Sequence, residues 1–262
     1  MRVEQLGDGA PDISIVAAIH GDEPCGVRAV DRLLEDAPSL ETPVKLIVAN
    51  EEALSRNERY LDADLNRSFD RDGPVRAHEH ELAIRLAAEV RDSTVLSIHS
   101  TRSYEDPFAI SAGLGSHVER IVPHLSVDAL VDASETMNGR LFEVDASVIE
   151  VEAGLQGSEG AAENAYRLAR EFLTATGALP GDTVARDLPA FKLTRPIEKP
   201  QAASYDVFTP NFSRVEAGEA FASAGDQMLR AESPFWPVLL SSDGYRDIFG
   251  YESERLETVS PT

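Results

Sequence analysis

The sequence contains one cysteine, Cys25, so no disulfide bond can form within the chain and a reducing compartment is expected. Its first ten residues, MRVEQLGDGA, lack the apolar core of a secretory signal peptide. No apolar run approaches the roughly 18 residues that a transmembrane helix needs. These absences together predict a cytoplasmic protein that has no membrane partner.

Lysine is also nearly absent from the chain. Only three of the 24 basic residues are lysine, and the 46 acidic residues give a net charge of −22. No basic patch interrupts the acidic residues, so nucleic acid is not an expected partner. An acidic chain with so little lysine resembles proteins of salt-loving organisms, whose surfaces repel themselves until salt screens them. We therefore expect adaptation to a salt-rich cytoplasm.

Short apolar runs alternate with segments of helical periodicity over the first two thirds of the 262 residues. The predicted strands are Ile13–Ile19, Val44–Ala49, Val95–Ile98, Phe108–Ser111 and Val148–Val151, and the predicted helices are Cys25–Glu35, His78–Val90 and Ala161–Thr174. Alternation of this kind predicts an α/β fold in which helices cover both faces of a sheet.

The composition changes after Ala178. Four prolines fall between residues 179 and 200, and short strand-like pieces separated by Gly, Pro and Asn begin at Ala190. These pieces are Phe191–Leu193, Tyr205–Phe208, Phe221–Ser223 and Pro237–Leu240. We predict a main domain over residues 1–178 and a small β-rich C-terminal domain over residues 179–262.

Two predicted strands are followed directly by histidine. His20 and Glu23 come after the first strand, and His99 comes after Val95–Ile98. The carboxyl ends of strands in an open α/β sheet are where such folds place their chemistry, so we expect these side chains to share one site. Two imidazoles and one carboxylate are typical of catalytic zinc, with the fourth position left for water.

A second polar cluster, Asp64-Leu65-Asn66-Arg67, lies between a predicted strand and a predicted helix, and Arg59 precedes it. A guanidinium binds a carboxylate through two parallel hydrogen bonds, and an adjacent asparagine adds a neutral donor. A solvated loop with locally paired charges would show the same composition. The pattern alone therefore leaves carboxylate binding and a plain loop both open.

The third cluster closes the predicted strand Val148–Val151. Glu150 and Glu152 lie two residues apart and so face the same side of a strand. A carboxylate at this position beside a metal can accept a proton from water. The pattern does not choose between the two glutamates, and an acidic loop would look similar.

In chain order the sequence carries HGDEPCG, RYLDADLNRSFD, SIHST and VEAGLQG. This series resembles the aspartoacylase and succinylglutamate desuccinylase family, a branch of the zinc carboxypeptidase fold. The likeness covers most of the first 165 residues. It implies a zinc-carboxypeptidase-like mixed sheet in the main domain, which would be the catalytic domain of a zinc hydrolase. The implied reaction is hydrolysis of the amide bond of a small N-acyl amino acid.

The resemblance also implies roles for individual residues in catalysis. His20, Glu23 and His99 would bind one zinc ion per chain. Glu152, the glutamate before x-Gly, would be the general base. Arg59 would polarise the scissile carbonyl and stabilise the developing oxyanion.

For the substrate, the resemblance implies that Asn66 and Arg67 hold a carboxylate and that Tyr245 makes a further contact. Two departures from aspartoacylases proper are present. The glutamate strand continues as Ala-Gly-Leu-Gln-Gly instead of Gly-Pro-Gln-Pro-Gln-Gly, and Arg140 lies near the expected place of a further substrate-binding arginine without matching its spacing. These departures leave the specific substrate open.

Two other functions remain open. A zinc carboxypeptidase acting on peptides would use the same metal ligands and the same Asn-Arg pair, although a small C-terminal domain narrows the cleft in the resembled family. A zinc protein without turnover would keep the metal ligands alone. Sites with two histidines and one glutamate also accept divalent ions other than zinc. The acyl group, the amino acid and assembly into a homo-oligomer are left open by the sequence.

The charge predicts a salt requirement. We expect the melting temperature to fall as KCl is lowered below molar concentrations, because repulsion among unscreened carboxylates then destabilises the compact state. Calorimetry across a KCl series would measure this, with sorbitol of equal osmolality as the control for solute exclusion. Equal melting temperatures in dilute buffer and in concentrated KCl would contradict the prediction.

Overall fold

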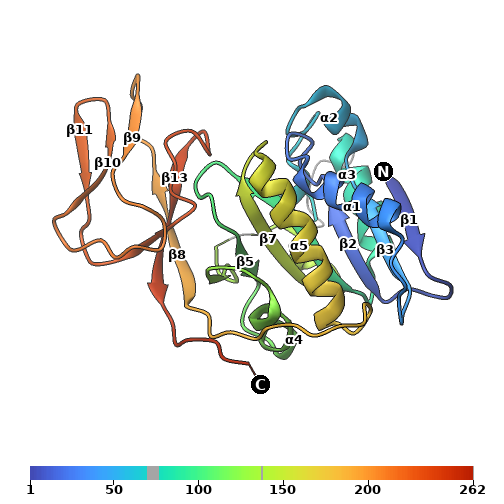
Figure 1. Ribbon diagram of the computed structural model, residues 1–262. Helices are drawn as coiled ribbons and strands as arrows, with labels where there is room; N and C mark the ends of the chain where they lie inside the picture. Colours follow the sequence, from blue (N-terminus) through green and yellow to red (C-terminus); the bar gives the residue numbers. More distant parts are fainter. Residues whose placement is uncertain (70–76, 137, 262) are drawn as a thin grey trace.

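A ten-stranded mixed sheet forms the centre of the protein (Figure 1). The computed structural model describes residues 1–69, 77–136 and 138–261. The order across the sheet is β1-β3-β2-β4-β7-β5-β6-β8-β13-β12. These strands are β1 (Arg2–Leu6), β2 (Ile13–Ala17), β3 (Val44–Val48), β4 (Thr94–Thr101), β5 (Phe108–Ser111), β6 (Leu130–Asp132), β7 (Ser147–Leu155), β8 (Ala190–Glu198), β12 (Trp236–Val238) and β13 (Ile248–Arg255). The predicted α/β class with a mixed sheet is confirmed.

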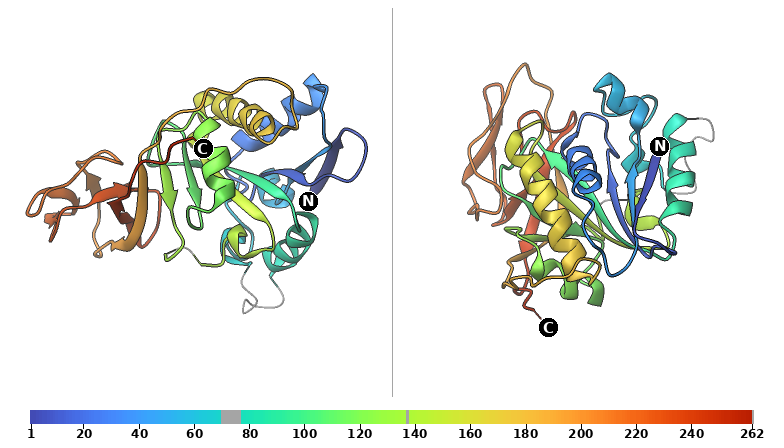
Figure 2. Two further views of the ribbon diagram at one scale, coloured as in Figure 1. Left: turned by 90° about the horizontal axis from the view of Figure 1, so that it is seen from below. Right: turned by 45° about the vertical axis from the view of Figure 1, so that its right-hand side comes forward.

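Helices cover both faces of this sheet, as the strand–helix alternation predicted (Figure 2). On one face lie α1 (Cys25–Asp36), α4 (Ser116–Ile121) and α5 (Glu159–Ala175), which pack on residues such as Ile15 of β2. On the other face lies α3 (His78–Glu89), which packs on Val16. A short helix, α2 (Glu51–Arg56), follows β3. Consecutive residues of β2, Ile15 and Val16, therefore belong to hydrophobic cores on opposite faces of the sheet.

The strands that carry the polar motifs are buried and run parallel. Strand β2 is buried at every residue, and β4 and β7 are buried over most of their length. β2 pairs in parallel with β4, and β4 pairs in parallel with β7. The carboxyl ends of three adjacent strands therefore lie at one edge, and the β4–β7 register places His99 opposite Glu152.

The C-terminal region is rich in β structure, as predicted. Three of its strands, β8, β13 and β12, extend the main sheet, while β9 (Tyr205–Val207), β10 (Ala220–Ala224) and β11 (Gln227–Arg230) form a separate three-stranded sheet. One hydrophobic cluster joins Phe108 and Ile110 to Phe191 and Val238 across residue 178. The two parts share a sheet and a core, and the division into domains at residues 178 and 179 stays a prediction.

Within the described parts of the chain, no helix combines the length and the apolar character needed to cross a bilayer.

Candidate active site

His20, Glu23 and His99 lie together at the carboxyl ends of β2 and β4, and all three side chains are buried. Glu23 Oε1 lies 2.8 Å from His20 Nδ1, and Glu23 Oε2 lies 3.1 Å from His99 Nδ1. One potential ligand atom from each residue falls within 4.8 Å of the others. The structure thus brings together the three residues that the sequence predicted as metal ligands.

The same cluster fits a divalent metal in the chemistry of its donors. The Nδ1 atoms of both histidines face the Glu23 carboxylate, and both Nε2 atoms have outer partners. His20 Nε2 lies 3.0 Å from an Asp64 carboxylate oxygen, and His99 Nε2 lies 3.1 Å from Ser97 Oγ. Outer partners of this kind orient imidazole ligands in metal sites. Two imidazoles with one carboxylate are a donor set that suits zinc.

The charged groups of this cluster shift one another's pKa values. Burial lowers the pKa of His20, but the adjacent Glu23 carboxylate and the hydrogen bond to Asp64 outweigh burial and raise this pKa to about 9. Burial opposes ionisation of Glu23, yet the histidines hold the pKa of Glu23 well below its usual value. The carboxylates that face His20 thus favour its protonated form, and His20 in turn favours the ionised form of Glu23.

The loop that carries His20 and Glu23 packs tightly against helix α2. A Cβ atom at Gly21 would lie 2.2 Å from the carbonyl carbon of Ala53 and 2.5 Å from the carbonyl oxygen of Glu58. The glycine is thus required by this close approach of two backbone segments. Just before the loop, Ala18 adopts a φ of 53°, a left-handed conformation that a non-glycine residue rarely takes.

Arg59 joins this cluster from the segment after α2. Its Nη1 donates to Glu23 Oε1 at 3.0 Å, and its Nη2 donates to Asp64 Oδ2 at 3.3 Å. Burial lowers the pKa of Arg59, but these two carboxylates more than offset burial and the pKa is raised. The side chain is 38% exposed and lines the pocket above the cluster, so its guanidinium contacts Glu23 and also borders the pocket.

The two glutamates of β7 have different surroundings. Glu152 lines the pocket, and its Oε2 lacks a hydrogen-bond partner among the described residues. Burial and the nearby Glu23 carboxylate raise the pKa of Glu152 to about 7. Glu150 lies one pleat deeper at 1% exposure, where Asn66 Nδ2 donates to its Oε1 at 3.1 Å and Arg140 Nη1 lies 2.9 Å from its Oε2.

A pocket of about 260 Å³ opens above these groups. Three residues for which the sequence suggested a role, Arg59, Glu152 and Tyr245, line it. Burial raises the pKa of the Tyr245 hydroxyl, so Tyr245 remains a hydrogen-bond donor at neutral pH. The residues that line the pocket are His20, Asp22, Glu23, Arg59, Ser100, Thr101, Arg102, Ser103, Arg140, Glu152, Gln156, Leu239, Gly244 and Tyr245.

Asn66 and Arg67, the predicted carboxylate-binding pair, do not line this pocket. The amide of Asn66 is fully buried, donates to Glu150 and accepts from the backbone N–H of Leu141 at 3.1 Å. Arg67 Nη1 donates to the carbonyl oxygen of Asn66 at 2.6 Å. Arg67 nevertheless lies close enough to Tyr245 for its charge to lower the pKa of that hydroxyl against the larger effect of burial.

Arg140, Arg102 and Gln156 are among the polar residues of the pocket to which the sequence assigned no role. Arg140 enters the pocket although its spacing from Glu152 is unusual. Arg102 Nε donates to Gln156 Oε1 at 2.6 Å, and Gln156 Nε2 donates to the carbonyl oxygen of Asp22 at 2.8 Å. Arg102 directly follows SIHST, and Gln156 lies within VEAGLQG. Their closeness to these motifs is the feature of the sequence that could have predicted their place in the pocket.

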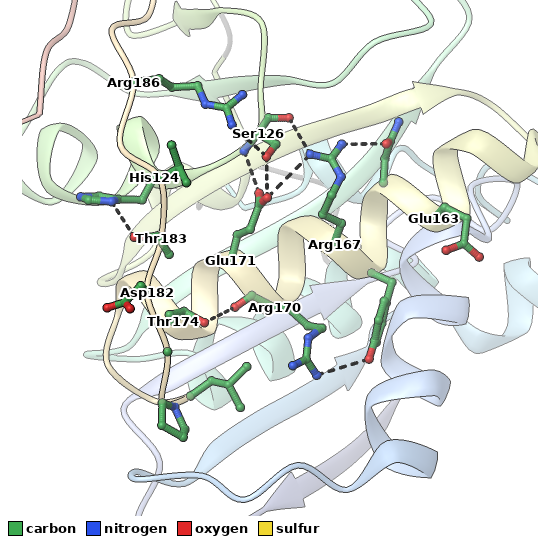
Figure 3. A pocket seen from close by; sticks show the side chains of 16 residues that line it. His124, Ser126, Glu163, Arg167, Arg170, Glu171, Thr174, Asp182, Thr183 and Arg186 are labelled. Carbon is green, nitrogen blue, oxygen red and sulfur yellow. Dashed lines mark hydrogen bonds and ion pairs between the residues drawn. The ribbon is translucent and has the colours of Figure 1, made fainter.

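A larger cavity, about 720 Å³, lies between α5 and the segment leading to β8 (Figure 3). Several of its charged side chains are hydrogen-bonded to neighbouring polar groups. Glu171 accepts hydrogen bonds from the backbone N–H and the hydroxyl of Ser126, and Arg167 donates to Asn164 Oδ1 at 2.7 Å. The cluster of potential metal ligands lies in the smaller pocket instead.

Comparison with known proteins agrees with this geometry. The sequence profile of the succinylglutamate desuccinylase/aspartoacylase catalytic domain matches residues 9–173, well over half of the chain. The chain belongs to the succinylglutamate desuccinylase/aspartoacylase family. The resemblance drawn from the motifs is thereby confirmed.

Individual curated relatives align with only a short part of this chain. Succinylglutamate desuccinylase of Pseudomonas fluorescens (strain SBW25) is 34% identical over 73 residues, which are 26% of this chain and 22% of that protein. The alignment thus spans about a fifth of the length of the curated relative.

Solved structures share the fold over nearly the whole chain. Succinylglutamate desuccinylase from Vibrio parahaemolyticus has a TM-score of 0.74 at 19% identity, covering 97% of this chain and 86% of its own. Murine aminoacylase 3 has a TM-score of 0.72 at 20% identity, covering 97% and 99%. The product-bound ectoine utilization protein EutE (DoeB) from Ruegeria pomeroyi has a TM-score of 0.75 at 17% identity, covering 98% and 88%.

In this member of the family, one buried carboxylate organises the segment that carries Arg59 and Asp64. Glu79, in the first turn of α3, accepts hydrogen bonds from the backbone N–H groups of residues 61, 62 and 63 at 2.7, 3.0 and 3.1 Å. The Asn50 amide donates to it at 3.0 Å. Burial opposes its ionisation, but these donors lower its pKa below the usual 4.5. Its contribution to stability is thus present above that pH and is lost as the pH falls.

We expect Glu79→Ala to lower the free energy of unfolding by on the order of 2 kcal/mol, because the buried Asn50 amide and three partly buried backbone N–H groups lose their shared acceptor. Denaturant unfolding in concentrated KCl would measure the loss. Glu81→Gln, an exposed change on the same helix, is the matched control and should unfold like the wild type. If Glu79→Ala and Glu81→Gln unfold at the same denaturant concentration, Glu79 has no such role.

Proposed function

We propose that the protein is a zinc-dependent hydrolase that cleaves the amide bond of an N-acyl amino acid. One observation supports this most directly: a buried His20–Glu23–His99 cluster lies beside Glu152, a carboxylate whose pKa is raised to about 7. A group with that pKa both accepts and returns a proton near neutral pH. Family membership supports the same reaction class.

In this proposal His20, Glu23 and His99 hold the zinc ion, one per chain. When bound, zinc would supply Lewis acidity that makes water acidic and the amide carbonyl electrophilic. We also propose that the protein is cytoplasmic and that zinc is the ion bound, among the divalent ions that such a site accepts.

The protein's own groups perform the proton transfers and orient the substrate. Glu152 takes a proton from the attacking water while the oxygen of that water forms a bond to the amide carbon. Arg59 lines the pocket and stabilises the negative charge that develops on the carbonyl oxygen. Glu152 then gives its proton to the leaving nitrogen as the carbon–nitrogen bond breaks, which yields a carboxylate and a free amino acid.

Arg67 and Tyr245 are the groups that we propose to hold the substrate carboxylate. Tyr245 lines the pocket, and the positive charge of Arg67 acts on the Tyr245 hydroxyl. The predicted contact of Asn66 with the same carboxylate would require its amide to leave Glu150 and the Leu141 backbone. The pocket volume of about 260 Å³ suits a small N-acyl amino acid better than a peptide, which makes a carboxypeptidase the second choice.

Metal content and amine release test the reaction class together. Protein purified in concentrated KCl should contain about one zinc per chain and should release amine from at least one member of a panel of N-acyl amino acids. Release from peptides alone would favour the carboxypeptidase. Bound zinc without release from any substrate would indicate a non-catalytic protein, and failure to bind zinc after its addition would contradict the proposal.

Glu152→Gln tests the general base. The amide cannot accept the proton, so we expect turnover to fall by about 10²–10⁴-fold while zinc content stays unchanged. In the wild type, kcat/KM should fall on the acid side as the Glu152 carboxylate is protonated, because protonation removes the base. The bound cation places this limb below the pH of about 7 that the surrounding protein groups alone would give. A near-wild-type rate for the variant, or an acid limb that persists unchanged in the residual activity of Glu152→Gln, would make the assignment wrong.

A further inference from the structure

Arg140 is a buried cation in the wall of the proposed active site, and its charge is already matched by a carboxylate of the protein. The Arg140 side chain is 4% exposed, and its Nη1 lies 2.9 Å from Oε2 of Glu150, which is itself 1% exposed. Burial lowers the pKa of Arg140, but Glu150 more than offsets this effect, so the pKa is raised. The guanidinium, which lines the pocket, and the carboxylate behind it therefore form a pair without net charge.

Glu150 also accepts the hydrogen bond of the Asn66 amide, the other group at this depth that could bind a substrate carboxylate. Asn66 Nδ2 donates to Glu150 Oε1 at 3.1 Å, while Asn66 Oδ1 accepts from the Leu141 N–H. Both cationic and neutral donors on this side thus serve one internal carboxylate. A substrate that placed a second carboxylate here would bring it close to the negative charge of Glu150. The charge of Arg140 would not offset this repulsion, because Glu150 already neutralises it.

The donors of Arg140 are nevertheless incompletely used. The contact with Glu150 is an ion pair outside hydrogen-bond geometry, and neither Nε nor Nη1 of Arg140 has a hydrogen-bond partner among the described residues. A buried guanidinium whose charge is neutralised but whose N–H groups remain unpaired favours a neutral acceptor, such as an amide or carbonyl oxygen. It gives little attraction to a further anion.

We infer that Glu150 excludes a second substrate carboxylate from the place beside Arg140, and that the substrate group placed against Arg140 is an uncharged hydrogen-bond acceptor. This inference rests on the proposed amide hydrolysis. The first carboxylate is the one assigned to Arg67 and Tyr245. Substrates with an acidic acyl group or an acidic side chain directed at Arg140 are excluded by the charge of Glu150.

Two matched pairs of substrates test the inference, because each pair differs in one charge at nearly constant shape. N-acetyl-L-asparagine is compared with N-acetyl-L-aspartate, and N-succinamoyl-L-alanine with N-succinyl-L-alanine. In at least one pair the wild type should prefer the neutral member by more than tenfold in kcat/KM. That pair shows which end of the substrate faces Arg140. Preference for the acidic member in both pairs would overturn the inference.

Glu150→Gln supplies the decisive variant, since it keeps the acceptor for Asn66 and removes the charge. It should shift the ratio of kcat/KM toward the acidic member by at least tenfold, mainly through KM. The double variant Glu150→Gln/Arg140→Gln restores a neutral pair and should lose this gain. It also serves as the control if the single variant folds poorly. An unchanged ratio in the single variant would overturn the inference.

Equilibrium binding separates this inference from the proposed function. Calorimetry in concentrated KCl would compare L-asparagine with L-aspartate, and succinamate with succinate, on zinc-loaded protein. Preferential binding of the neutral ligands without turnover of any N-acyl amino acid would support the charge restriction and contradict the hydrolase. Turnover with preferential binding of the acidic ligands would do the reverse. No binding and no turnover would contradict both.

Discussion

The Glu23 carboxylate is the charge on which the geometry of the site depends. Its oxygens lie within hydrogen-bonding distance of the imidazoles of His20 and His99. They also accept hydrogen bonds from the Arg59 guanidinium at 3.0 Å and from the backbone N–H of Ser100 at 3.2 Å. Removing such a carboxylate from water is costly, and the cost is offset only while its partners stay in place. Those partners come from different segments of the chain, so the ends of β2 and β4 and the segment after α2 are held to one another through this carboxylate.

The parallel sheet makes this convergence possible, and the sequence predicted this part well. Continuous apolar runs such as Ile13–Ala17 are typical of strands covered on both faces, and they appear as strands at nearly the predicted positions. Once two such strands are adjacent and parallel, residues just beyond their ends meet at one edge. The grouping of His20, Glu23 and His99 therefore followed from local pattern and topology alone.

Other parts depend on contacts between distant segments, and local pattern does not contain them. Arg140 enters the site because residues 139–141 lie along residues 66–69, as shown by the bonds from Phe69 N–H to the Gly139 carbonyl and from Leu141 N–H to Asn66. Strand spacing gives no hint of this. Likewise β13, with Gly250 and several charges, lacks a clear apolar run, yet it pairs with β8 in the main sheet. The different surroundings of Glu150 and Glu152 could not be predicted from an alternation that places both on one face.

The distribution of charge sets different demands on the surface and on the site. Arg59 and Arg140 each contact a carboxylate at about 3 Å within the protein, where mobile ions screen little. The excess of acidic residues that gives the charge of −22 is mostly exposed, and its repulsion is screened over a distance set by the salt concentration. Salt should therefore change the stability of the fold far more than the charge balance within the pocket. The selectivity that we infer for Glu150 is a property of the buried pair, so it should be the same in dilute and in concentrated salt.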